Sequence, residues 1–328
     1  MLSRTSSQQR NPTRRETALD KPVVTVAAAM RNQAPHLPTW LAHLEQQNFP
    51  AASFEIVLAD LGSEDGSPDL AERHARGAPV RTRVVRLNGG SVAKGFNVAL
   101  REASGKYVVF LSPFVLAGPN LLARYAATQQ QAESPQCVLG AVQPHPQLAP
   151  GALTHWYLPE DRCHCVDGRP RSFLDWHANN LSAPRQVLLD AGAFDEGFDV
   201  SEFEGAELAW RLRGSGHLAG LCNEAVGYIW RGISFEEAYE RQYTRGQCLW
   251  RLCQVTQARE IGRRFMVPPG RARMLANRFV IPFYERACRQ AEPDTRLLGT
   301  VYRRTLRHAR FRGFVDAEHG RVTLDIQT

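Results

Sequence analysis

The chain has 328 residues, a formal net charge of +7 at pH 7, and 43% hydrophobic residues. This length is enough to bury a sizeable core and suits one large domain with an extension. No run of about 18 apolar residues occurs, so no transmembrane helix is predicted. The seven cysteines are odd in number and scattered through a large chain. They favour a reducing, cytoplasmic location over a disulfide framework.

The positive charge comes almost entirely from arginine, since lysine occurs only at positions 21, 94 and 106. No basic patch interleaved with aromatic residues is present, and neither is a nucleic-acid-binding motif, so nucleic acid is not an expected partner. Residues 1–20 are polar and basic without an apolar segment, which excludes a secretory signal and predicts a disordered basic tail.

Taken in chain order, apolar and amphipathic segments alternate, which predicts an α/β fold with a mostly parallel central sheet flanked by helices. The predicted strands cover 23–28, 55–59, 80–87 and 106–111, and the predicted helices cover 36–47, 68–75 and 92–103. Asn32, Asp60, Asn88 and Ser112 fall at the ends of the four strands. Ligands of open α/β sheets bind beyond the carboxyl ends of the strands, so these residues predict a ligand cleft.

The C-terminal part of the chain has a different character. From about residue 233 it is helix-like and rich in arginine, with breaks at 268–270 and 292–294, and residues 255–328 hold 15 arginines against 7 acidic residues. These helices are either a basic surface that contacts acidic lipids peripherally or an acidic partner, or a layer that covers the sheet with a solvated basic face. We therefore divide the chain into a tail (1–20), an α/β domain (21–232) and a helical C-terminal extension (233–328).

Four segments in order resemble the family 2 glycosyltransferases of the GT-A fold. Residues 23–32 resemble the first strand and its loop, and residues 54–67 resemble the Asp-rich turn after the second strand. Residues 88–100 resemble the start of the family's third helix, and residues 176–196 resemble its acceptor-side segment. The resemblance implies a GT-A-type domain that binds a nucleotide-sugar.

The family's metal-binding motif is absent. In the family, the loop after the fourth strand carries Asp-x-Asp, but here it reads Ser112, Pro113 and Phe114, none of which offers a carboxylate to a hard cation. The histidine that completes the cation site in many members falls at Ile229 or Trp230. The resemblance therefore implies a transferase whose usual metal site is lost, and no divalent metal cofactor is expected there.

The resemblance assigns donor binding to Asn32, Asp60, Lys94, Asn97 and Ser112. Asp60 would accept a hydrogen bond from the nucleobase imide, which favours a UDP-type donor. Alternatively, Asp60 caps its own turn. Lys94 would neutralise the diphosphate, or it is a solvated helix residue.

On the acceptor side the resemblance points to residues of two segments: Trp176, Asn180, Ser182, Arg185 and Glu207. In the family, the second acid of a Glu-Asp pair before a helix is the catalytic base, but here the pair reads Glu204 and Gly205. Glu204 is therefore the tentative base, with Glu202 and Asp199 behind it. Alternatively, Glu204 is an acid stabilised by the dipole of the helix that it begins.

A soft-metal cluster is one interpretation of the metal-ligating residue types found between positions 155 and 177: His155, Asp161, Cys163, His164, Cys165 and His177. However, Cys-x-Cys is not a standard zinc spacing, and a variable acceptor loop with free thiols is the more ordinary interpretation.

Two functions remain open from the sequence. The first is an inverting, metal-independent transfer of sugar from a UDP-type donor to an acceptor that the sequence does not identify. The alternative is a non-catalytic pseudo-glycosyltransferase that acts as a scaffold or regulatory protein partner of an active enzyme.

Overall fold

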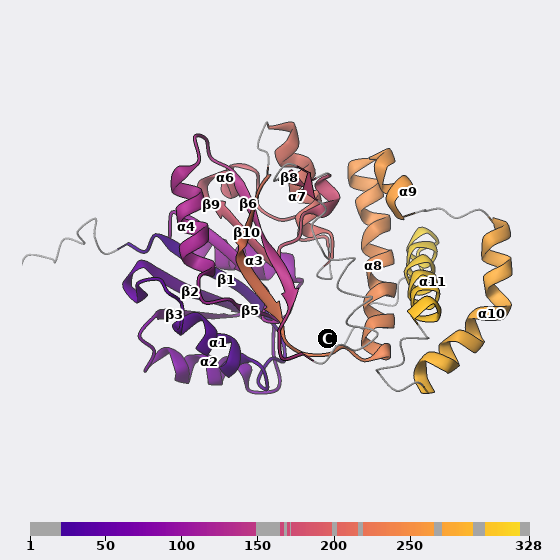
Figure 1. Ribbon diagram of the computed structural model, residues 1–328, viewed down its shortest axis with the longest axis horizontal. Helices are drawn as coiled ribbons and strands as arrows, with labels where there is room; N and C mark the ends of the chain where they lie inside the picture. Colours follow the sequence, from indigo (N-terminus) through magenta and orange to yellow (C-terminus); the bar gives the residue numbers. More distant parts are fainter. Residues whose placement is uncertain are drawn as a thin grey trace, which may run out of the picture.

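The computed structural model describes residues 21–148, 165–166, 169–170, 172–198, 202–215, 219–265, 271–290 and 299–321. A mixed eight-stranded sheet forms the centre of the α/β part, with helices on both faces (Figure 1). The strand order is β3-β2-β1-β4-β9-β6-β10-β5. The predicted fold class, including helices at the C-terminal end, is confirmed.

The strands of the sheet are β1 (Val24–Met30), β2 (Phe54–Asp60), β3 (Arg81–Arg86), β4 (Tyr107–Leu111), β5 (Val115–Ala117), β6 (Cys137–Pro144), β9 (Asn180–Pro184) and β10 (Ala219–Ile229), and a separate hairpin joins β7 (Cys165–Val166) to β8 (Arg169–Pro170). The helices are α1 (Leu37–Glu45), α2 (Ser67–Ala75), α3 (Val92–Glu102), α4 (Leu121–Gln131), α6 (Arg185–Asp190), α7 (Glu204–Gly214), α8 (Phe235–Thr256), α9 (Arg259–Phe265), α10 (Arg271–Gln290) and α11 (Gly299–Glu318), and short 3-10 turns cover η2 (Ala51–Ser53) and η4 (Phe173–Asp175).

The central strands are apolar on both faces because helices cover both sides of the sheet. Every residue of β1, β2 and β4 is buried, which is typical of parallel strands in α/β proteins. Phe96 of α3 packs on Phe110 of β4 and on Phe194, with ring centroids 5.0 and 5.5 Å apart. Phe96 is therefore a core residue that packs α3 onto the sheet.

The strand directions bring the predicted ligand loops to one edge of the sheet. β1, β2, β3 and β4 are parallel to one another, β6 and β10 are parallel to each other, and β9 and β5 run antiparallel to their neighbours. The loops after β1 and β2 are joined by a hydrogen bond from the Asn32 amide to the Ser63 hydroxyl (2.8 Å). Trp40 of α1 donates to the Ser112 carbonyl (3.2 Å) in the loop after β4. The predicted convergence of these loops is therefore present.

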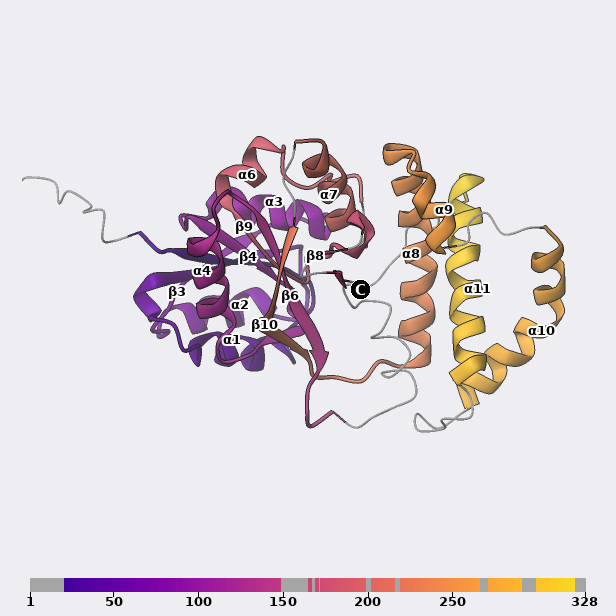
Figure 2. The ribbon, with the colours of Figure 1, turned by 45° about the horizontal axis from the view of Figure 1, so that its top comes forward.

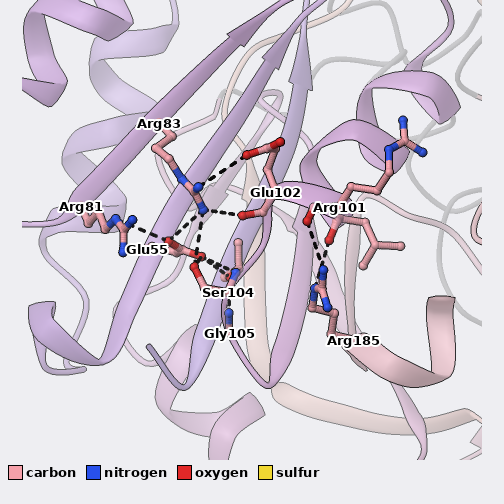
Figure 3. Close-up of polar contacts among 10 residues, drawn as sticks. Glu55, Arg81, Arg83, Arg101, Glu102, Ser104, Gly105 and Arg185 are labelled. Atoms are coloured by element: carbon pink, nitrogen blue, oxygen red, sulfur yellow. Dashed lines mark hydrogen bonds and ion pairs between the residues drawn. The ribbon is translucent and has the colours of Figure 1, made fainter. Parts of the chain in front are cut away.

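A buried carboxylate organises the opposite, amino edge of the sheet (Figure 3). Glu55 at the start of β2 accepts hydrogen bonds from Thr25 (2.9 Å), from the amide and hydroxyl of Ser104 (2.7 and 2.8 Å) and from Arg83 (3.3 Å). Burial alone would raise the pKa of Glu55, but these hydrogen bonds and the Arg83 charge together lower it below its ordinary value. Glu55 therefore ties β1, β2, β3 and the α3–β4 turn together as an ionised group.

The C-terminal helices form a layer beside the α/β part, in which α8 and α11 lie side by side (Figures 1 and 2). Arginines of α8 and α9 join this layer to the rest of the chain through ion pairs that include Arg241–Glu202 (2.7 Å), Arg251–Asp195 (2.8 Å) and Arg264–Asp175 (2.6 Å). At least part of the basic face is therefore directed inward. None of the helices in the described ranges is both long and apolar enough to cross a membrane. Residues 1–20 and the breaks at 268–270 and 292–294 lie outside the described residues.

Candidate active site

A pocket lies between the segment after η4, the start of α7 and the C-terminal helices. Its lining residues are Leu174, Asp175, Trp176, His177, Ala178, Asn179, Glu202, Phe203, Glu204, Gly205, Arg241, Arg245 and Arg264. The predicted base Glu204 and the predicted acceptor residue Trp176 thus meet in one site. Sequence reasoning missed the three arginines as site residues, although the four-residue spacing of Arg241 and Arg245 places both on one face of a helix.

Glu204 is the first residue of α7 and points into this pocket from a buried position. Its side chain belongs to a residue only 4% exposed, and its Oε2 atom has no hydrogen-bond partner in the described part of the chain. Burial, together with the negative charge of Glu202, raises the pKa of Glu204 to about 7. A carboxyl group with that pKa exchanges a proton readily at neutral pH, which is the property of a general base or acid.

Gly205 leaves little room for the acid that the family carries at this position. A Cβ atom on Gly205 would lie 3.1 Å from the backbone of His177 and Ala178. An aspartate here would therefore require the 177–178 backbone to shift. The acid one position earlier, Glu204, lines the pocket as the structure stands.

The other acids of the pocket are held in ion pairs. Glu202 accepts from Arg241 (2.7 Å) and lies 3.7 Å from Arg245, and Asp175 lies 2.6 Å from Arg264. Both carboxylates are therefore engaged by arginine side chains of the C-terminal helices. Asp199, the other acid predicted to stand behind Glu204, lies outside the described residues.

The predicted donor residues Asn32 and Asp60 lie together at the carboxyl edge of β1 and β2. Asn32 has a left-handed backbone (φ 52°), and its side-chain oxygen accepts from the Glu64 amide (3.0 Å). Asp60 is 2% exposed and accepts from the amides of Gly62 (3.3 Å) and Ser63 (3.2 Å). This geometry is that of an aspartate capping its own turn, the alternative that the sequence left open for Asp60.

Lys94 and Ser112 border the same edge. Lys94 is half-buried in the first turn of α3, and its Nζ atom lies 3.5 Å from the Gly89 carbonyl. The Ser112 hydroxyl accepts from the amide of Phe114 (3.3 Å) and so closes the loop after β4.

Asn97 uses its amide group inside the protein. Its oxygen accepts from the Phe194 amide (2.9 Å), and its nitrogen donates to the Phe194 carbonyl (2.9 Å) and to Glu196 (3.0 Å). Since Asn97 is also buried, this geometry argues against the predicted donor contact. Asn97 instead fixes the segment around Phe194 on α3.

Burial within the sheet revises the acceptor assignment for two residues of β9. β9 runs antiparallel to β4, with Asn180 opposite Leu111 at the carboxyl end of β4. Asn180 and Ser182 are 0% exposed. Asn180 donates to the carbonyls of Ala141 (3.0 Å) and Ala225 (2.9 Å) within the sheet. Buried and engaged in this way, Asn180 and Ser182 are sheet residues and cannot reach an acceptor.

Arg185 and Glu207 are also structural. Arg185 follows β9 at the amino edge of the sheet, where its guanidinium donates to the carbonyls of Leu100 (3.2 Å) and Arg101 (3.0 Å) at the end of α3 (Figure 3). Such contacts cap the C-terminus of a helix. Glu207 binds Arg211 through both carboxylate oxygens (2.6 and 2.8 Å). Of the predicted acceptor residues, only Trp176 lines the pocket.

The loop after β4 does not fit a divalent cation. Phe114 is 41% exposed, and the Arg231 guanidinium lies 5.1 Å from the centre of its ring. This loop thus offers no carboxylate and already has a positive charge beside it. Among the described residues, no group of three or more His, Cys, Asp or Glu side chains could hold a metal ion. The segment from His155 to His164 lies outside the described residues, as does the Cys165 side chain.

The fold and the placement of the ligand loops define a GT-A-type domain, and comparison with known proteins agrees. The structure is similar to mannosyltransferase PcManGT from Pyrobaculum calidifontis, at a TM-score of 0.64 and 18% identity, over 92% of this chain and 88% of that one. It is also similar to Staphylococcus aureus TarS residues 1–349 bound to UDP, at a TM-score of 0.52 and 16% identity, over 92% of this chain and 94% of that one.

Residues 25–124 match the model of glycosyl transferase family 2, so the predicted resemblance to this family is confirmed. The chain is also 27% identical over 233 residues to validoxylamine A glucosyltransferase of Streptomyces hygroscopicus subsp. jinggangensis. That match covers 63% of this chain and 55% of the relative, so the chain spans about half the length of that curated protein.

Proposed function

We propose that the protein is an inverting glycosyltransferase that transfers a sugar from a nucleotide-sugar donor without a divalent metal, with Glu204 as the base. The observation that carries this proposal is the state of Glu204: buried, with an oxygen that lacks a hydrogen-bond partner in the described chain, and with a pKa of about 7. Such perturbed carboxyl groups in pockets are concentrated at catalytic sites.

The proposed reaction is a single displacement. The Glu204 carboxylate accepts the proton of an acceptor hydroxyl as that oxygen attacks the anomeric carbon of the donor sugar. The bond between this carbon and the diphosphate breaks, and the nucleoside diphosphate leaves with the electron pair. Trp176, 7% exposed in the wall of the same pocket, would offer an aromatic face to a sugar ring.

A nucleotide-sugar donor is supported by the similar structures, which were solved with GDP-mannose and Mn²⁺ and with UDP. We favour a UDP-type donor because Asp60 stands where the family's carboxylate meets the nucleobase. Asp60 caps its own turn, but a carboxylate has roughly four acceptor sites, so it keeps capacity to accept from a nucleobase.

Titration with UDP, GDP and their sugar derivatives, with and without Mn²⁺, tests the proposal directly. We expect nucleotide binding that Mn²⁺ does not strengthen, and release of nucleoside diphosphate in the presence of an extract that supplies acceptors. Absence of both binding and turnover would overturn the proposal and favour the non-catalytic scaffold.

Glu204→Gln should then lower kcat by roughly 10²- to 10⁴-fold with donor affinity little changed, as for the loss of a general base. Glu202→Gln is the matched variant, because it removes the same charge from the same pocket but from a carboxylate held by Arg241 (2.7 Å). Equal losses in the two variants would remove the base assignment from Glu204.

A further inference from the structure

An arginine and an aromatic ring meet where the loop after β4 reaches the end of β10. β10 pairs antiparallel with β5, with Ile229 opposite Val115. The residues after Ile229 therefore lie next to the loop before Val115. The Arg231 guanidinium lies 5.1 Å from the centre of the Phe114 ring in this loop. The strand directions from β4 through β9 and β6 to β10 place this end of β10 at the ligand edge of the sheet.

Arg231 is held from a second side by a fixed carboxylate. Its Nη1 atom lies 3.0 Å from an oxygen of Glu237. The other Glu237 oxygen accepts from the Ser234 amide (2.9 Å), and the Glu237 amide donates to the Ser234 hydroxyl (3.1 Å), a capping box at the start of α8. A guanidinium has five N–H donors, so Arg231 retains donors for a ligand after this ion pair.

The loops after β1 and β10, at the ligand edge of the sheet, each hold a hydrogen-bond donor that lacks an acceptor among the described residues. The indole nitrogen of Trp230 and the Nε atom of Arg31 are buried and have no hydrogen-bond partner in the described chain. The His36 ring packs against Trp230 with 5.2 Å between the ring centroids. Buried donors normally find an acceptor, so this arrangement favours a ligand rich in acceptor oxygens.

We propose that Arg231, seated on Phe114 and Glu237, binds the diphosphate of the donor in place of the family's divalent cation. This inference rests on the proposed function. A guanidinium matches phosphate oxygens in a bidentate manner and stabilises the negative charge that develops on a departing diphosphate. Arg231 transfers no proton in this step. In this arrangement the face of the Phe114 ring supports the Arg231 guanidinium through a cation–π contact.

Calorimetric titration of UDP, GDP and uridine into the wild type and three variants with EDTA present, and into the wild type also with Mn²⁺, tests this assignment. Arg231→Ala should weaken nucleoside diphosphate binding roughly 10-fold or more, as for the loss of a hydrogen bond to a charged group. Uridine, which lacks phosphate, should bind the variant as it binds the wild type. Arg231→Lys should restore part of the affinity, since it keeps the charge but not the fork.

Arg81→Ala is the matched control, because it removes the same charge from a side chain that is 62% exposed at the amino edge of the sheet. Equal affinity of wild type and Arg231→Ala for UDP and GDP would overturn the inference and leave the proposed function standing. A wild type that binds these nucleotides only with Mn²⁺ would also overturn it. A wild type that binds neither nucleotide under any condition would refute the proposed function, and this inference with it.

Discussion

Replacing Glu204 with Gln should stabilise the protein above neutral pH, although it removes the proposed base. Burial raises the pKa of this carboxyl group from an ordinary 4.5 to about 7. At 1.36 kcal/mol for each pH unit, that difference corresponds to about 3 kcal/mol. Between the two pKa values the folded chain holds a proton that the unfolded chain has released, so the free energy of unfolding falls as pH rises through this window. Above pH 7 the loss is complete.

Urea denaturation of wild type and Glu204→Gln at pH 5 and pH 8 measures this effect. The advantage of the variant over the wild type should be larger at pH 8 by about 2 to 3 kcal/mol. His308, whose pKa is lowered by burial and by Arg312, is present in both proteins and cancels in the comparison. A stability difference that is the same at both pH values, within about 0.5 kcal/mol, would refute the raised pKa and weaken the base assignment.

Three other changes have defined outcomes. Glu55→Gln should destabilise the protein by about 2 kcal/mol at pH 7. Because the pKa of Glu55 is lowered in the folded chain, the stability difference between wild type and variant in urea denaturation should shrink below pH 4.5. Asn97→Ala should lower stability by about 2 kcal/mol in the same assay and leave UDP affinity unchanged, whereas a selective loss of UDP binding would restore its donor role. The double variant Ser112→Asp/Phe114→Asp should bind UDP without dependence on Mn²⁺. Arg231 lies 5.1 Å from the ring that is replaced and would pair with the new carboxylate. Calorimetry that shows a Mn²⁺-dependent UDP affinity would contradict this expectation.

Local pattern and residue identity were enough to predict the elements of the α/β part that lie closest to the ligand edge. Continuous apolar runs and helical spacing placed β1 to β4 and α1 to α3 within one or two residues of their observed bounds. Parallel strands end at one edge, so the meeting of the loops that hold Asn32, Asp60 and Ser112 followed from the same pattern. The absence of carboxylates at positions 112–114 is read directly from the amino-acid sequence.

Tertiary structure alone decided which residues share the site. β9 lies between β4 and β6, which buries Asn180 and Ser182 in the sheet. Its antiparallel direction carries Arg185 to the far edge, and local periodicity encodes neither of these outcomes. Long-range packing brings α8 and α9 to the start of α7, so that Arg241, Arg245 and Arg264, which lie far beyond Glu204 in the sequence, line its pocket. The same packing excludes water from Glu204 and raises its pKa, because the cost of burying a charge depends on what surrounds it in space.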